Sequence, residues 1–76
     1  MKSNVTKAIA RSLAQTAATR SRILIAAQAE FKAQGFTKSR LARIAREANS
    51  STQRIYEIVG NKLDLYNTAM EANRAP

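Results

Sequence analysis

The chain has 76 residues, of which 13 are Lys or Arg and five are Asp or Glu, so its net charge at neutral pH is +8. It contains no cysteine and no histidine, which excludes disulfides and removes the commonest zinc ligands and general bases. A chain of this length forms one small domain. Because the five carboxylates are scattered along the sequence, we expect no metal site, no cofactor and no enzymatic activity.

The basic residues are unevenly distributed. Residues 1–54 contain eleven of the thirteen basic residues and two of the five acidic ones. This separation favours a polyanionic partner, nucleic acid before an anionic membrane, although basic residues can also serve only to solubilise a surface. No apolar run approaches the ~20 residues that span a bilayer, and the N-terminus lacks a signal-peptide pattern. We expect a cytoplasmic protein with no membrane partner.

Residues 1–18 are interpreted as a basic N-terminal extension. Val5, Ile9 and Leu13 recur at four-residue intervals, which favours a helix from about residue 6 that either joins the next helix or breaks near residues 16–19. Because the apolar face is thin, a segment that orders only on binding is the open alternative.

The remaining sequence is typical of an all-α bundle, four or five helices in total. Only two glycines and one proline occur, and β-branched residues never alternate over a strand length. The first clear helix covers about residues 19–34 and ends at Gly35, which tolerates positive φ. Ile23, Ala27 and Phe31 form its inward face, and Phe36 is expected to fold back against it.

A helix-turn-helix is predicted at about residues 41–56. The second helix follows Ser39, its expected N-cap, and ends near residue 47. Asn49 suits a left-handed turn, and Ser51 caps a third helix over residues 52–58. Gly60 ends that helix, and Asn61 caps a fourth.

In a helix-turn-helix the later of the two helices, here the third helix of the chain over residues 52–58, enters the DNA major groove. The N-terminal residues of this helix meet base edges. Thr52, Gln53 and Arg54 are the predicted base-contacting residues, because Gln pairs with adenine, Arg with guanine, and the Thr methyl group with thymine. The alternative is that they are polar residues on a solvated helix face.

Phosphate contacts are predicted around this helix, at helix starts with free N–H groups and at flanking basic side chains. Tyr56 has a second interpretation, simple core packing, and both can hold together. The predicted phosphate contacts are Ser39, Arg40, Arg43, Ser51, Tyr56, Asn61 and Lys62.

Several linked blocks also carry a family resemblance. The stretches are TRSRILIAAQAEF, QGF, LARIAREA, SSTQRIY and NKLDLY, and residues 19–67 resemble the DNA-binding domain of tetracycline-repressor-type (TetR family) regulators. The resemblance implies a homeodomain-like helix-turn-helix domain over residues 19–76, with the recognition helix after Ser51. It also places Ser39, Tyr56 and Lys62 at phosphates, and residues 52–54 at bases.

The chain departs from that family at three places. Asn49 stands where glycine is usual, residues 59–60 replace an aromatic-proline pair, and Glu30 replaces an apolar residue. Such regulators also continue into a ligand-binding, dimerising domain, whereas this sequence ends at Pro76. We therefore expect no small-molecule ligand, with Glu30 on a face that packs against no second domain. A naturally short protein is the expectation, and a fragment of a longer chain is the alternative.

The leading hypothesis is a sequence-specific double-stranded-DNA-binding transcriptional regulator, a repressor that binds a short palindromic operator without an inducer. The alternatives are a non-specific architectural DNA-binding protein and a protein-interaction module acting on another regulator. Dimerisation is open: the candidate surfaces are the stripe of Val5, Ile9 and Leu13 and the edge formed by Tyr66 and Met70, and a homodimer that forms only on DNA is the third possibility.

Overall fold

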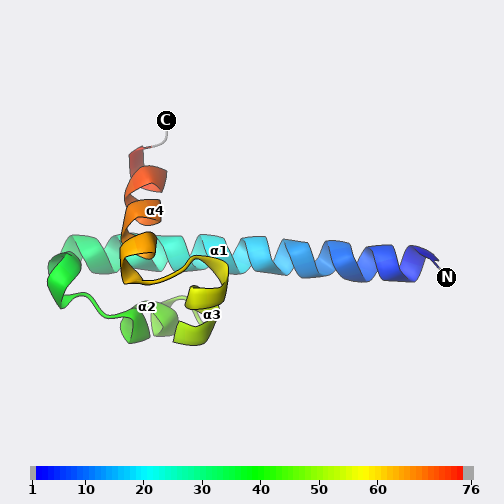
Figure 1. The fold of residues 1–76 in the computed structure, drawn as a ribbon, viewed down its shortest axis with the longest axis horizontal. Helices are drawn as coiled ribbons and strands as arrows, with labels where there is room; N and C mark the ends of the chain where they lie inside the picture. Colours follow the sequence, from blue (N-terminus) through cyan, green and yellow to red (C-terminus); the bar gives the residue numbers. More distant parts are fainter. Residues whose placement is uncertain (1, 75–76) are drawn as a thin grey trace.

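The computed structural model describes the backbone of residues 2–74 and the side chains of residues 16–72. This part of the chain forms four helices and no strand (Figure 1), which confirms the predicted all-α bundle. The helices are α1 (Lys2–Lys38), α2 (Leu41–Glu47), α3 (Thr52–Ile58) and α4 (Lys62–Arg74).

Helix α1 is much longer than the others and interrupted only near its end. Its backbone stays helical through residues 16–19, where the sequence allowed a break. Gly35 has φ 76° and ψ 175°, a conformation that favours glycine, and it kinks the helix where a C-cap was predicted. The side chains of the proposed Val5, Ile9 and Leu13 stripe lie outside the described residues.

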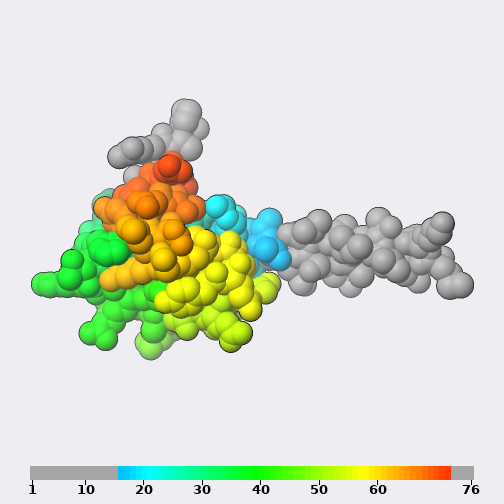
Figure 2. All heavy atoms as spheres, in the orientation of Figure 1, coloured from blue at the N-terminus to red at the C-terminus, as the bar shows by residue number. Residues whose placement is uncertain are grey.

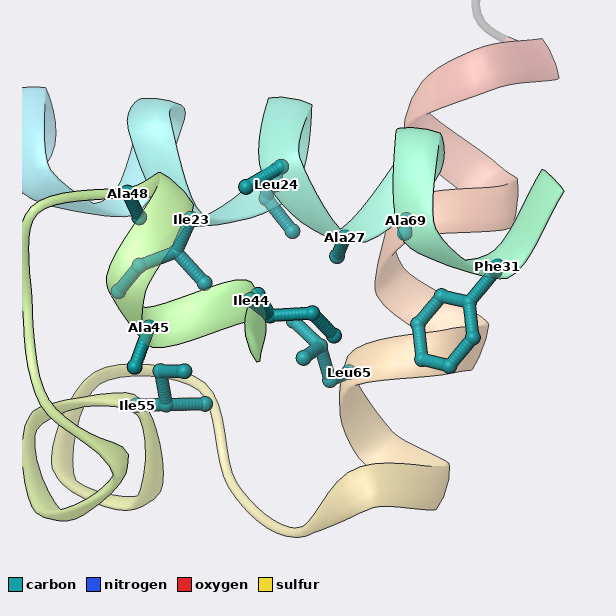
Figure 3. Packing of buried hydrophobic residues seen from close by; sticks show 11 residues of the cluster. Ile23, Leu24, Ala27, Phe31, Ile44, Ala45, Ala48, Ile55, Leu65 and Ala69 are labelled. Carbon is teal, nitrogen blue, oxygen red and sulfur yellow. The ribbon is translucent and has the colours of Figure 1, made fainter. Parts of the chain in front are cut away.

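The core lies where the four helices meet. Ile23, Ile44, Ile55 and Leu65 are each fully buried, and they come from α1, α2, α3 and α4 in turn (Figure 3). Burying one such side chain contributes ~1.5–3 kcal/mol. Because α3 packs mainly against α1 and α2, these two helices set its position.

An aromatic cluster joins the end of α1 to α4. The Phe36 ring stacks 6.2 Å from Phe31, and both rings meet Tyr66 edge-on at centroid distances of 5.2 and 5.0 Å. The Gln28 amide also donates to the Ala69 carbonyl at 3.1 Å. The prediction that Phe36 folds back after the glycine is confirmed.

Candidate nucleic-acid interface

The turn between α2 and α3 is tight and well bonded. Asn49 has φ 55°, the left-handed conformation predicted for it, and the Ser50 N–H donates to the Ala45 carbonyl at 2.8 Å. Ala45 and Ala48 are buried, so no large side chain separates the two helices at this point. The Arg22 guanidinium donates through Nε to the Ala48 carbonyl at 3.2 Å and so ties the turn to α1.

Helix α3 begins with a complete cap. Ser51 is extended (φ −134°, ψ 160°), and its hydroxyl accepts the Arg54 N–H at 3.1 Å, as predicted. Thr52, Gln53 and Arg54 are all exposed, while Ile55 directly after them is fully buried. The buried Ile55 thus holds the start of α3 against the core, while the three residues before it are exposed. Atoms of α3, yellow in Figure 2, lie at the surface in that view.

One acidic residue accompanies the predicted base readers. Glu57 lies one turn after Arg54, and their side chains form an ion pair with Nη1 and Oε1 at 3.6 Å. Both side chains are about half exposed, and exposed pairs of this kind stabilise proteins by only ~0–1 kcal/mol. Arg54 is thus held weakly and can exchange this partner for another anion.

Tyr56 lies on the same helix, and the residue is 55% exposed. Simple core packing, one of the two interpretations left open by the sequence, does not describe this ring. The hydroxyl is available to a ligand on the outer side of α3.

The start of α2 differs from the prediction. Ser39 is 3% exposed, and its hydroxyl donates to the Phe36 carbonyl at 2.8 Å instead of capping α2. The N-cap is Arg40, extended at φ −129° and ψ 129°, with no side-chain cap bond of its own. The prediction of Ser39 as N-cap is wrong, because the kink at Gly35 turns its hydroxyl back onto the end of α1.

Glu30 supplies the missing cap from another helix. Its side chain is buried, and Oε2 accepts the Arg40 N–H at 3.0 Å and lies 3.7 Å from Nη1 of Arg43. Glu30 is therefore buried against α2 within this domain. The carboxylate also takes one of the N–H groups at the start of α2 that were expected to receive a phosphate.

The start of α4 forms a reciprocal capping box. The Asn61 amide oxygen accepts the Asp64 N–H at 2.8 Å, and the Asp64 carboxylate accepts the Asn61 N–H at 3.1 Å. Asn61 is thus the cap that the sequence predicted. Asp64 was missed, although an Asn followed three residues later by an acidic residue is a recognisable signal.

Lys62 is anchored at the junction of α1 and α4. Its ammonium donates to the Thr37 carbonyl at 3.4 Å and lies 4.8 Å above the Phe36 ring. A cation placed over a ring in this way contributes ~0.5–1 kcal/mol at an exposed site. Lys62 therefore has a defined position near the surface rather than a freely moving head group.

Taken together, the predicted residues fall into three groups. One group is α3 with its N-cap Ser51, and the second is Arg40 and Arg43, which lie beside Glu30 at the start of α2. The third is Asn61 and Lys62 at the start of α4, while Ser39 is buried against the end of α1 and belongs to none of these groups. A groove of about 430 Å³ between α2 and the start of α3 adds Arg46 and Ser50 to the polar residues predicted from the sequence. Its lining consists of Ala42, Ala45, Arg46, Asn49, Ser50, Ser51 and Thr52.

The chain is similar in sequence to a known transcriptional repressor. The chain is 44% identical over 54 residues to the HTH-type transcriptional repressor SCO4008 of Streptomyces coelicolor, an alignment that covers 71% of this chain and 28% of that protein. The chain thus spans little more than a quarter of this relative. No family model matches the chain. No solved structure matches it either. Within the described residues, none of the helices combines the length and apolarity needed to cross a bilayer.

Proposed function

We propose that this chain binds double-stranded DNA through α3 and acts in transcriptional repression. The observation that carries the proposal is the capped start of α3, where three exposed polar side chains, residues 52–54, precede the buried Ile55. A helix held in this way presents its first turn to a groove without rearrangement. The repressor of Streptomyces coelicolor, similar over most of this chain, supports the same function.

Base reading is assigned to the first turn of α3. Gln53 can pair with adenine and Arg54 with guanine through two hydrogen bonds each, and a good pair of this kind discriminates by ~1–3 kcal/mol. Thr52 can place its methyl group against thymine. The ion pair between Arg54 and Glu57 is weak, so Arg54 can exchange it, at a small cost in affinity, for the two acceptors of a guanine edge.

Phosphate binding is assigned to the exposed side chains around α3. Arg40, Arg43, Ser51, Tyr56, Asn61 and Lys62 keep the role proposed from the sequence. Ser39 fits it poorly, because its hydroxyl is buried and already donates to Phe36. Because Glu30 accepts the Arg40 N–H, the side chains of Arg40 and Arg43 are the groups of α2 proposed to bind a phosphate.

Membership of the TetR family, a palindromic operator, a homodimer on DNA, a cytoplasmic location and the lack of a small-molecule ligand remain predictions. A palindrome follows if two copies each place one α3 in a half-site about one helical turn (~34–36 Å) apart. These points concern assembly and regulation and are separate from the role of α3.

Selection of bound duplexes from a random pool tests the proposal. A recovered consensus, with its half-site spacing, supports sequence reading, and no enrichment over random DNA contradicts it. Arg54→Ala is expected to relax the preference at one position, whereas Lys62→Ala weakens all duplexes about equally.

The second candidate is a non-specific architectural DNA-binding protein, which the net charge of +8 favours. In that case Arg54→Ala and Lys62→Ala lower affinity to a similar degree on every duplex, with no change in preference.

A further inference from the structure

Helix α1 is longer than the bundle requires. Among the described side chains, the first buried one is Ile23, and Arg22 just before it bonds to the Ala48 carbonyl. The 21 helical residues from Lys2 to Arg22 correspond to ~30 Å at 1.5 Å per residue. Figure 1 shows this part of α1 extending past α3 and away from the other helices.

The same part of the chain is free of acidic residues. Residues 1–29 contain five basic residues and no Asp or Glu, and the first carboxylate is that of Glu30. The other 47 residues hold eight basic and five acidic ones. The segment therefore cannot neutralise its charge internally, and a polyanion is its natural complement. The five basic residues are Lys2, Lys7, Arg11, Arg20 and Arg22.

We propose that residues 2–22 of α1 bind phosphates of the DNA that flanks the site contacted by α3. The inference rests on the proposed DNA binding and adds a second contact region to it. The Arg22 to Ala48 bond fixes the base of the segment at the turn that precedes α3. From there ~30 Å of helix corresponds to about nine base pairs at 3.4 Å each. Phosphate contacts need no match to base sequence, so the segment adds affinity without adding specificity.

A second copy of this chain is the competing occupant, because Val5, Ile9 and Leu13 recur on one face of the segment. Charge argues against it: two such segments brought together would place basic residues near basic residues, with no carboxylate among residues 1–29 to compensate. DNA relieves that repulsion and a second copy increases it.

The test compares two full-length double variants that each lower the net charge from +8 to +6, Lys7→Gln/Arg11→Gln and Lys32→Gln/Arg74→Gln. Lys32 lies near the C-terminal end of α1, away from residues 2–22. Arg74 is the last residue of α4, which ends on the side of α1 opposite α2 and α3 (Figure 1). Duplex titrations between 50 and 200 mM salt are expected to give a slope of log K against log salt that is less steep by about 1.8 for the first variant, since each lost phosphate contact removes ~0.9. The second variant is expected to keep the original slope.

Trimming the duplex provides an independent measurement. The unmodified chain is expected to lose affinity as the flank beyond the selected site falls below about nine base pairs, whereas Lys7→Gln/Arg11→Gln, which keeps Lys2, Arg20 and Arg22, is expected to lose less. An unchanged slope for this variant, or an equal reduction for both variants, overturns the inference while the proposed function stands. The inference is also overturned if the chain forms a dimer without DNA and the Val5→Gln/Ile9→Gln variant does not. If the unmodified chain binds no duplex, the proposed function fails as well.

Discussion

The carboxylate of Glu30 caps a helix to which it does not belong. Its Oε2 accepts the Arg40 N–H at 3.0 Å, so a residue of α1 closes the start of α2. The same oxygen lies 3.7 Å from the Arg43 guanidinium. Because α2 has only seven residues, this single cap has a large share in fixing its direction, and with it the direction of α3.

Replacing Glu30 with alanine is expected to destabilise the domain. Loss of a helix cap costs ~0.5–2 kcal/mol, which corresponds to a fall in Tm of roughly 4–8 °C per kcal/mol for a domain of this size. Glu30→Gln keeps an acceptor for the Arg40 N–H and should lose less. Thermal unfolding followed by circular dichroism measures both.

The control for this change is Glu71→Ala, which removes an exposed carboxylate from the outer part of α4. Its Tm is expected to stay close to that of the unmodified chain. If Glu30→Ala is as stable as Glu71→Ala, the cap contributes nothing measurable and α2 is oriented by apolar packing alone.

The two isoleucines at positions 55 and 25 should respond very differently to truncation. Ile55 is fully buried below the exposed start of α3, whereas Ile25 is 67% exposed on α1. Ile55→Ala is expected to cost ~2–5 kcal/mol through lost burial and the cavity left behind. That is a large part of the stability of so small a domain.

Ile25→Ala should change the free energy of unfolding by no more than about 0.5 kcal/mol, as is usual for surface positions. Urea unfolding of both variants gives the comparison. Equal midpoints would contradict the view that α3 is anchored through Ile55.

The two glycines make a second matched pair. Both have positive φ, 76° at Gly35 and 137° at Gly60. A Cβ at Gly35 meets no atom within 4 Å, whereas one at Gly60 collides with the Asp64 carboxylate that caps α4. Backbone strain of this kind costs ~1–3 kcal/mol, so Gly35→Ala is expected to show that cost alone.

Gly60→Ala carries the same strain and also displaces the Asp64 cap, so its Tm should be the lower of the two. The difference in Tm between Gly60→Ala and Gly35→Ala measures the cost of the collision with Asp64. If Gly60→Ala is as stable as Gly35→Ala, the collision with Asp64 adds no measurable loss.

How much of this arrangement the sequence could predict depends on the distance along the chain between the groups involved. Ser51 with Arg54 and Asn61 with Asp64 are three residues apart, so a cap signal contains all the information needed. The Glu30 to Arg40 bond spans ten residues and the Lys62 to Thr37 bond 25. Both depend on how α1 packs against other helices, which no local pattern specifies.

Ser39 is a case in which a local cap signal was misleading. Serine directly before an apolar helical pattern is a good N-cap signal, and it predicted the start of α2 to within one residue. The kink at Gly35 nevertheless brings the Phe36 carbonyl within 2.8 Å of the Ser39 hydroxyl. The hydroxyl is then occupied, and Glu30 closes the helix instead.

Glu57 is expected to restrain DNA binding through its ion pair with Arg54. The two side chains are 3.6 Å apart at their charged atoms, on the helix proposed to enter the groove. Glu57→Gln removes a negative charge beside the phosphates and releases Arg54, so affinity for the selected duplex should rise by about threefold to tenfold, or ~0.6–1.4 kcal/mol. Stability should change little, because an exposed pair one turn apart contributes at most ~1 kcal/mol.

The matched control for Glu57→Gln is Glu71→Gln, which changes the net charge equally on α4, away from α3. It is expected to raise affinity much less, and the difference should shrink at high salt as charges are screened. Combining Glu57→Gln with Arg54→Ala should abolish the part of the gain that comes from releasing Arg54. If Glu57→Gln and Glu71→Gln raise affinity equally, the gain comes from the change in net charge. The ion pair between Glu57 and Arg54 then contributes nothing to DNA affinity.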